Sequence, residues 1–298
     1  MSDPYQHKTL NLLILGARGF LGSYLVEAGH ARFQIIRADR TADRGTDLVI
    51  DVADPTSVRA GFAATKPDVA ILLSAIADID LCQREPEMAC AVNQQGALHV
   101  AQACAEHGAR LLFTSTGAVF DGTRDQYVEG DPTSPISVYG VTKARAEEAV
   151  QQILPEGLIV RASLVLGRAL RPNANSLIES LFRCWQRGQT VFALENELRN
   201  PIDASTLAAW MLRLIEDRRN GIYHAGSSDL LSRLAIAQSV ARKLQIDPRL
   251  VQSDVSPSPQ RAPRGPRHFL ISQKIGQACN TGVPSSEEVV LRSLYESA

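Results

Sequence analysis

Short apolar runs alternate with longer segments of helical periodicity through the first half of this chain. The apolar runs cover residues 10–15, 33–38, 69–73, 111–115 and 158–160, and the helical segments cover residues 20–30, 58–65, 86–107 and 137–154. Strands that alternate with helices form right-handed crossovers, which place parallel strands in one sheet with helices on both faces. The alternation therefore predicts an α/β fold with a doubly wound parallel sheet.

The composition argues against several functional classes. The 298 residues are 45% hydrophobic and 21% charged, with a net charge of -1, which argues against disorder and against a broad basic surface for nucleic acid. The cysteines form no CxxC pair and the histidines form no HExxH motif, so we expect neither a disulfide framework nor a metal site. Residues 1–9 are polar, and the apolar runs are too short to cross a bilayer. We therefore expect a cytoplasmic protein that binds a small molecule and has no membrane or nucleic-acid partner.

Three glycines follow the first predicted strand at a spacing typical of dinucleotide-binding proteins. They form a GxxGxxG motif at the turn into the first predicted helix. Glycine lets the backbone turn sharply and approach a pyrophosphate, while the helix N-terminus supplies N–H groups and a favourable dipole. We therefore expect a Rossmann-type domain that binds NAD or NADP at this turn. The expected contacts are Gly16, Arg18, Gly19, Phe20, Leu21 and Gly22.

Further cofactor contacts are predicted where the following strands end. Asp39 ends the second strand, where a carboxylate can accept hydrogen bonds from the adenosine ribose hydroxyls, and this favours NAD. Arg18 and Arg40 are placed where a guanidinium can pair with a 2′-phosphate, which favours NADP, so both cofactors stay open. The candidates that follow two further apolar runs are Asp51, Val52, Ser74 and Ala75.

The alternation becomes less regular after Gly167. A helical segment at 176–188, a strand at 190–194, a strand at 221–226, a helical segment at 232–244 and a Pro- and Arg-rich loop at 256–267 follow. The strand at 221–226 resembles one more strand of the main sheet. We therefore expect an NAD(P)-binding Rossmann domain over residues 1–168, to which residues 221–228 return. A smaller, interleaved α/β region for substrate binding is expected over residues 169–220 and 229–298.

A tyrosine and a lysine lie one helical turn apart in the segment 137–154. Tyr139 and Lys143 form a YxxxK pair, so both side chains project from one helix face. Tyrosine, with a pKa of about 10, is a weak acid, and a neighbouring cation lowers that pKa. We expect carbonyl reduction with a hydride from nicotinamide and a proton from Tyr139, while Lys143 also binds the nicotinamide ribose. Thr116 or Ser115, at the end of a predicted strand, would hold the carbonyl oxygen.

With these motifs the chain resembles the extended short-chain dehydrogenases/reductases, and among them the dTDP-4-dehydrorhamnose reductase-like reductases of nucleotide sugars. The resemblance covers nearly the whole chain. It is carried by residues 16–22, 91–93, 115–116, 119–122, 129–135, 138–143, 146–147, 161, 199–201, 221–224 and 261–267. It implies NAD(P)H-dependent reduction of a keto group, most specifically on a 4-keto-6-deoxy nucleotide sugar.

The resemblance also implies roles for residues beyond the YxxxK pair. Asn93 would support the active-site helix and a water relay, and it counts among the cofactor contacts. Asn175 and Arg199 would face the nucleotide sugar. Arg264 or Arg267 would bind its diphosphate through two parallel hydrogen bonds.

Two segments depart from the family pattern. Gly117 and Ala118 stand where members of the family usually carry an acidic residue and an aromatic residue. We therefore expect a roomier and less polar pocket beside Thr116. Asp78 and Asp80 follow the fourth strand at positions where relatives vary, so the ring substituents that are recognised can differ.

Two other functions are compatible with the same resemblance. Relatives that resemble the β subunit of methionine adenosyltransferase keep the fold as NAD(P)-binding regulatory subunits, and other extended members are NAD-dependent epimerases or dehydratases. The intact Thr116, Tyr139 and Lys143 favour an enzyme, and Gly117 and Ala118 lack the acidic side chains that dehydratases add. A homodimer is expected only from the general frequency of twofold oligomers.

Overall fold

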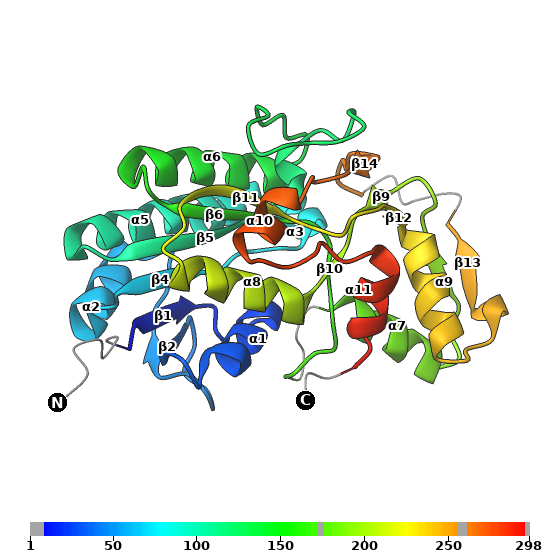
Figure 1. Cartoon of the computed structure of the whole chain (residues 1–298), viewed down its shortest axis with the longest axis horizontal. Coiled ribbons are helices and arrows are strands. Elements are labelled where there is room, and N and C mark those ends of the chain that lie inside the picture. The colour runs from blue at the N-terminus through cyan, green and yellow to red at the C-terminus, as the bar shows by residue number, and fades with distance from the viewer. Residues whose placement is uncertain (1–8, 172–175, 255–260, 296–298) are drawn as a thin grey trace.

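The computed structural model describes residues 9–171, 176–254 and 261–295, and its main feature is a seven-stranded sheet (Figure 1). In sheet order the strands are β11 (Gly221–Ala225), β6 (Leu158–Ala162), β5 (Arg110–Thr116), β4 (Val69–Leu72), β1 (Asn11–Leu15), β2 (Gln34–Asp39) and β3 (Leu48–Val49). Neighbouring strands pair in parallel throughout. The strand order runs in opposite directions from β1 and β4, which confirms the predicted doubly wound sheet.

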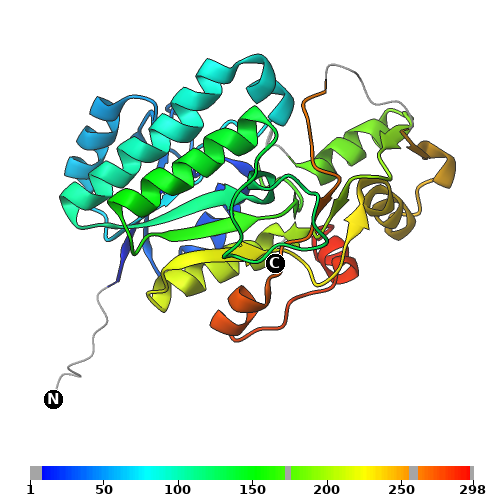
Figure 2. The same ribbon diagram turned by 90° about the horizontal axis from the view of Figure 1, so that it is seen from above.

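Both faces of the sheet are buried because apolar residues occupy most positions of its central strands. In β1, Leu12 and Ile14 join one core cluster while Leu13 and Leu15 join the other, as the twofold period of a strand requires. Helices cover each face (Figures 1 and 2). One layer contains α1 (Phe20–Gly29) and α8 (Ala204–Glu216), and the other contains α2 (Pro55–Thr65), α5 (Gly96–His107) and α6 (Val138–Ile153).

Two predicted helices differ from the structure in detail. Helix α2 begins before the predicted residue 58, because the Asp54 side chain accepts a hydrogen bond from the Thr56 amide at 2.8 Å and Pro55 fits the first turn. The segment predicted as one helix over 86–107 contains α4 (Pro86–Ala89), a π-helical stretch (Cys90–Gln95) and α5. Such π-helical stretches often occur at functional sites, and this one carries Asn93.

A smaller region lies at one end of the sheet, on the right of Figure 1. Its parallel pair β8–β13 packs against α9, and α9 packs against α11. The helices of this region are α7 (Leu177–Gln186), α9 (Arg233–Lys243) and α11 (Ser286–Arg292). Its strands are β8 (Val191–Ala193), β9 (Leu198–Arg199), β12 (Leu231–Ser232), β13 (Val251–Ser253) and β14 (Arg267–His268). Nearby short elements are β7 (Val165–Leu166), β10 (Ile202–Asp203) and α10 (Gln273–Ala278).

Helix α8 joins the main unit although it lies in the segment 169–220 that we assigned to substrate binding. It packs against α1, and its Leu207, Met211 and Leu214 belong to the core cluster that contains Leu12. The chain therefore returns to the main sheet earlier than residue 221. The domain division stays a prediction, and this packing favours counting α8 with the Rossmann domain.

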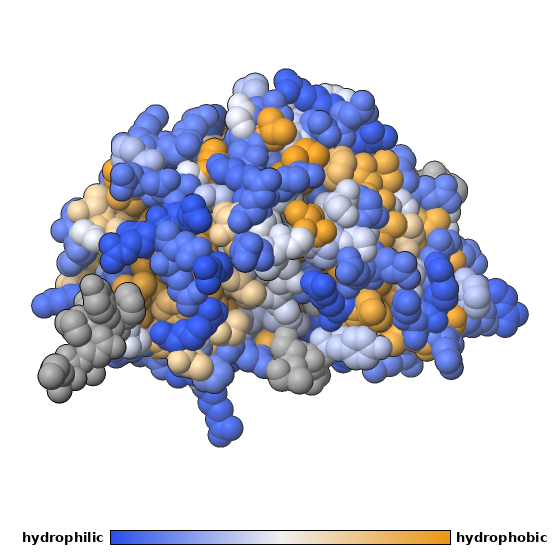
Figure 3. Space-filling model, viewed as in Figure 1, coloured by the Kyte–Doolittle hydropathy of each residue, from blue (hydrophilic) through white to orange (hydrophobic). Residues whose placement is uncertain are grey.

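The surface seen in Figure 3 is mostly hydrophilic, with apolar side chains in separated groups. The two clusters on either side of the sheet hold most of the buried apolar residues. In the described parts of the chain, no helix has both the length and the hydrophobicity that crossing a membrane requires.

Candidate active site

A cavity of about 930 Å³ opens at the carboxyl ends of the strands, where the strand order changes direction. Ligands of doubly wound sheets bind at this place, and the volume is near the upper end of the usual ~300–1,000 Å³ for small-molecule sites. The predicted residues that line it are Gly16, Arg18, Gly19, Phe20, Leu21, Gly22, Asp39, Ala75, Ser115, Thr116, Tyr139, Lys143, Arg199 and Arg264. The structure thus brings the glycine turn, the YxxxK pair and two arginines of the smaller region around one space.

Five predicted cofactor contacts do not line this cavity: Asn93 and four residues near the ends of strands. Arg40 is exposed, and the Asp51 carboxylate accepts the Ala53 amide at 2.9 Å, which shapes its own loop. Val52 is buried against Gly96, and the amide of Ser74 bonds to β1. A position at a strand end therefore does not by itself place a side chain in the cavity lining, because local hydrogen bonds and packing decide where each side chain points.

Asn93 has a supporting role rather than a place in the cavity lining. It is 2% exposed, and its amide group bonds to both the N–H (2.8 Å) and the carbonyl (3.1 Å) of Ile76. It also donates to Thr142 Oγ1 of α6 at 3.3 Å. Asn93 therefore joins the loop after β4, which lines the cavity, to the helix that carries Tyr139. Asn175 lies outside the described residues.

The glycine turn fits a pyrophosphate. Gly16 has a φ of 90°, and a Cβ atom there would lie 2.9 Å from the amide nitrogen of Ser74. A Cβ atom at Gly22 would lie 2.3 Å from the carbonyl oxygen of Gly16, so α1 approaches the turn as closely as glycine allows. Gly19 directly precedes α1, and no side chain caps this end of the helix. Its amides are therefore available to an anionic group.

Asp39, at the end of β2, and Arg18, in the glycine turn, both line the cavity. Asp39 accepts the amide of Arg18 at 3.1 Å and that of Arg40 at 3.0 Å. The Arg18 guanidinium pairs with Asp43 and bonds to Thr41 Oγ1 at 3.2 Å. The group that favours NAD and the group that favours NADP thus lie at the same edge of the cavity.

Tyr139 is brought to Thr116 by the close packing of α6 on the turn after β5. A Cβ atom at Gly140 would lie 2.2 Å from the carbonyl oxygen of Ala118, so the helix start lies directly against this turn. Burial raises the pKa of Tyr139 to about 12, and a hydrogen bond with Thr116 acts in the opposite direction. This differs from the expectation that Lys143 lowers that pKa, because desolvation dominates. At neutral pH Tyr139 is a phenol, the form that donates a proton.

Lys143 is buried below Tyr139 on the same helix, with 3% of its surface exposed. Its ammonium donates to the carbonyl oxygen of Thr114 at 2.6 Å and lies 4.0 Å from the centre of the Phe113 ring. Burial lowers its pKa to about 7, while the carboxylate of Glu147 raises it. The charge of Lys143 therefore changes near neutral pH, in contact with β5 at the floor of the cavity.

The ionisation of Lys143 predicts how catalysis depends on pH. Lys143 is cationic below its pKa of about 7 and neutral above it, whereas Tyr139 keeps its proton up to about pH 12. We therefore expect kcat/KM, which reports the free enzyme, to fall as the pH rises through about 7. In a Lys143→Arg variant the guanidinium stays charged, so this step should vanish. A wild-type profile that is flat from mildly acidic to alkaline pH would contradict the assignment.

The hydroxyl of Ser115, which we expected to hold the carbonyl oxygen of the substrate, instead bonds to a buried carboxylate. Its hydroxyl donates to Glu147, which is 2% exposed and forms an ion pair with Arg161 at 2.7 Å and 3.0 Å. The guanidinium of Arg161 also lies 3.4 Å from Nε2 of His224. The side chain of Ser115 thus belongs to a buried polar network behind β5, and Thr116 is the strand-end residue whose hydroxyl meets Tyr139.

The two residues that depart from the family pattern line the cavity beside Thr116. The amide of Ala118 donates to Thr116 Oγ1 at 3.2 Å, which fixes that hydroxyl. A Cβ atom at Gly117 would lie 3.3 Å from the Leu270 side chain. Leu270 therefore fills part of the space that a larger side chain at position 117 would take, and the less polar pocket stays a prediction.

The smaller region contributes a wall rich in arginine. Arg199, Arg233 and Arg264 line the cavity together with Glu197. Burial lowers the pKa of Arg199 to about 10, and the charges of neighbouring arginines act in the same direction. Arg267, the alternative to Arg264, pairs with the exposed Asp125 at 2.7 Å and does not line the cavity.

Several lining residues were missed by sequence reasoning. Ser163 follows β6, and its buried hydroxyl, like that of Thr114, has no hydrogen-bond partner among the described residues. The position of Ser163 after a predicted strand was a usable signal. Glu197, Arg233 and His268 carry no such signal, because only the tertiary fold brings them to the sheet edge.

Comparison with protein families matches residues 10–297 to the family described as the RmlD substrate binding domain. The chain belongs to this family. Among its relatives is the dTDP-4-dehydrorhamnose reductase of Streptomyces griseus, which is 33% identical over 88% of this chain and 85% of the relative. The dTDP-4-dehydrorhamnose reductase of Escherichia coli (strain K12) is 28% identical over 96% of this chain and 98% of its own.

Solved structures confirm the fold of this RmlD-family chain. A dTDP-4-dehydrorhamnose reductase from Bacillus anthracis, crystallised with NADP, superposes with a TM-score of 0.86 and 24% identity over 97% of this chain and 100% of that chain. The family and the fold therefore agree with the resemblance found in the sequence.

Proposed function

We propose that this chain reduces the keto group of a nucleotide sugar with NADPH or NADH, the preferred class being 4-keto-6-deoxy nucleotide sugars. The observation that carries the proposal is the single cavity that joins the glycine turn, Tyr139 with Thr116 and Lys143, and an arginine-rich wall. Relatives named dTDP-4-dehydrorhamnose reductase support the same substrate class.

The nicotinamide cofactor, when bound, supplies the hydride that forms the new C–H bond. Tyr139 donates its proton to the carbonyl oxygen, so that the ketone becomes an alcohol and the cofactor is oxidised. The hydrogen bond with Thr116 stabilises the phenolate that this donation leaves behind. Lys143, held on Thr114, adds positive charge at the floor of the site when it is protonated.

The arginine-rich wall supports a diphosphate-containing substrate. Arg199, Arg233 and Arg264 face the cavity with the carboxylate of Glu197, so positive charge exceeds negative charge on this wall. Guanidinium groups bind phosphate oxygens through paired, charge-assisted hydrogen bonds. A nucleoside diphosphate at this wall would direct the attached sugar towards Tyr139.

The test is cofactor oxidation by the purified chain. NADPH and NADH are each mixed with dTDP-4-keto-6-deoxy sugars, and the loss of reduced cofactor is followed by its near-ultraviolet absorbance. The proposal expects turnover that requires both cofactor and keto sugar. Cofactor binding without turnover on any keto sugar would contradict it.

We further propose that the chain works in the cytoplasm and forms a homodimer. The first expectation comes from the cysteine pattern and the polar N-terminal residues of the sequence, and the second from the general frequency of twofold oligomers. Light scattering of the purified chain tests the second.

A further inference from the structure

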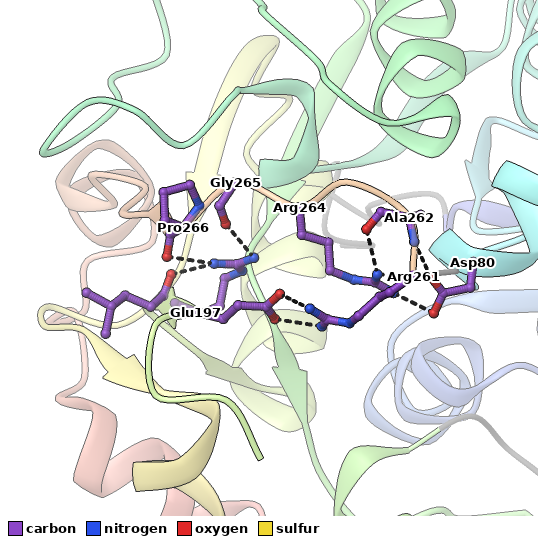
Figure 4. Close-up of polar contacts among 9 residues, drawn as sticks. Asp80, Glu197, Arg261, Ala262, Arg264, Gly265 and Pro266 are labelled. Carbon is purple, nitrogen blue, oxygen red and sulfur yellow. Dashed lines mark hydrogen bonds and ion pairs between the residues drawn. The ribbon is translucent and has the colours of Figure 1, made fainter. Parts of the chain in front are cut away.

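One wall of the cavity is a segment of irregular chain, residues 261–265, which we call the strap (Figure 4). It extends from the smaller region to α3 (Ile79–Arg84), which follows β4 in the main unit. Residues of both segments line the cavity. They are Asp78, which caps α3, with Ile79 and Leu81 of α3, and Pro263, Arg264 and Gly265 of the strap. The strap and α3 therefore meet at the substrate side of the site.

The smaller region holds both ends of the strap. Arg261 forms a two-point ion pair with Glu197, whose Oε2 lies 3.0 Å from Nη2. At the other end, Nη2 of Arg199 donates to the carbonyl oxygen of Gly265 at 3.0 Å. These contacts fix the strap to the region that bears it, but they do not join it to the Rossmann domain.

Gly265 packs against Asp121 and Gly122 of the Rossmann domain. Asp80 joins the other part of the strap to that domain. Its Oδ1 and Oδ2 accept hydrogen bonds from Nη1 and Nη2 of Arg264 at 3.0 Å and 2.8 Å, and Oδ1 also accepts the amide of Ala262 at 2.8 Å. The Arg264 side chain is 13% exposed and that of Asp80 34%, so water screens the pair only in part. The three contacts hold the pKa of Asp80 at about 2. The carboxylate therefore stays charged at neutral pH.

Asp80 does not itself line the cavity. Among the described residues that line the cavity, Asp80 is absent, whereas its partner Arg264 is present. Its carboxylate therefore acts on the cavity through the strap. The glycine turn between β1 and α1, and Asp39 at the end of β2, are predicted contacts of the cofactor and make no hydrogen bond to the strap in the described structure.

We propose that Asp80 is a positioning residue for the nucleotide-sugar substrate, which ties the strap to α3 and thereby holds Pro263, Arg264 and Gly265 in place as a wall of the cavity. This role rests on the function proposed above. A wall that is ordered before binding reduces the conformational entropy that the substrate must otherwise remove. The effect falls on substrate affinity, because Asp80 touches no reacting group.

The test compares wild type with Asp80→Ala, using dTDP as the probe in calorimetry and a keto nucleotide sugar in kinetics. We expect the Kd for dTDP and the KM for the sugar to rise about tenfold, while kcat and the Kd for the cofactor change less than about twofold. Asp80→Glu keeps a carboxylate and should recover part of the affinity. Amide hydrogen exchange at Ala262 should accelerate in Asp80→Ala, since the Asp80 oxygen that accepts this N–H is removed.

A matched control separates positioning from the loss of a negative charge. Asp125 pairs with Arg267 just beyond the strap and is 97% exposed, so Asp125→Asn removes the same charge without releasing the strap. Its Kd for dTDP should equal that of wild type.

Three results would overturn the role of Asp80. They are unchanged dTDP affinity and KM in Asp80→Ala, unchanged exchange at Ala262, or a joint loss of kcat and cofactor affinity that indicates general structural damage. If wild type neither binds dTDP nor reduces a nucleotide sugar, the proposed function itself fails, and the inference fails with it.

Discussion

Replacing Tyr139 with phenylalanine should lower kcat by about 10³-fold, because general-acid catalysis by a positioned side chain contributes about 10²–10⁴-fold. The hydroxyl that the variant loses is the proton donor beside Thr116. The ring stays, so the packing of α6 on the turn after β5 is preserved. The affinity for NADPH should change less than about twofold, since the glycine turn is untouched.

The comparison needs kinetics and binding on the same preparations. Turnover with a keto nucleotide sugar gives kcat, and fluorescence titration gives the Kd for the cofactor. Tyr295→Phe is the matched control, because Tyr295 is 67% exposed and should leave kcat unchanged. If Tyr139→Phe retained more than about a tenth of the wild-type kcat, another group would have to supply the proton.

Replacing Glu147 with glutamine should destabilise the fold by about 3–5 kcal/mol, because it leaves a buried guanidinium without its counter-ion. Arg161 is 3% exposed and pairs with Glu147 through Nε and Nη2. The substitution also weakens the bond from Ser115. Urea unfolding followed by circular dichroism gives the free energy.

Two further variants test the cause of that loss. In Glu147→Gln with Arg161→Met, the unpaired charge is gone, so much of the stability should return. Glu287→Gln removes the partner of Lys243 at a position 77% exposed and should cost less than about 1 kcal/mol. A single Glu147→Gln variant as stable as wild type would show that the ion pair of Glu147 with Arg161 does not contribute to the free energy of unfolding.

The sequence predicted those parts of the site that local patterns specify. The glycine turn depends on a strand and a helix adjacent in the chain, and the Tyr139–Lys143 pair depends on one helical turn, so both could be placed at the cavity in advance. Asp51 and Val52 also follow a strand, but their side chains bond or pack within their own loop and do not line the cavity, so their contact with the cofactor stays a prediction. The direction in which a side chain points at a strand end depends on tertiary contacts, which local sequence patterns do not specify.

Burial explains the other differences. Desolvation raises the pKa of Tyr139 and lowers that of Lys143, and neither degree of burial can be read from residue spacing. The strap and Asp80 are separated by most of the chain, so each segment could be noted from the sequence but their contact could not be predicted. For the same reason, the packing of helix α8 on the main sheet was not predicted: its partner α1 lies much earlier in the chain.

Isotope labelling shows directly whether the chain transfers a hydride from the cofactor to the keto carbon of a nucleotide sugar. The purified chain is mixed with dTDP-4-keto-6-deoxy sugar and NADPH or NADH that carries deuterium at the transferring position, and the product is analysed by mass spectrometry and NMR. We predict one deuterium at the former keto carbon for each cofactor oxidised, and almost none with Tyr139→Phe. A wild-type chain that binds the cofactor but leaves the sugar without deuterium would contradict it.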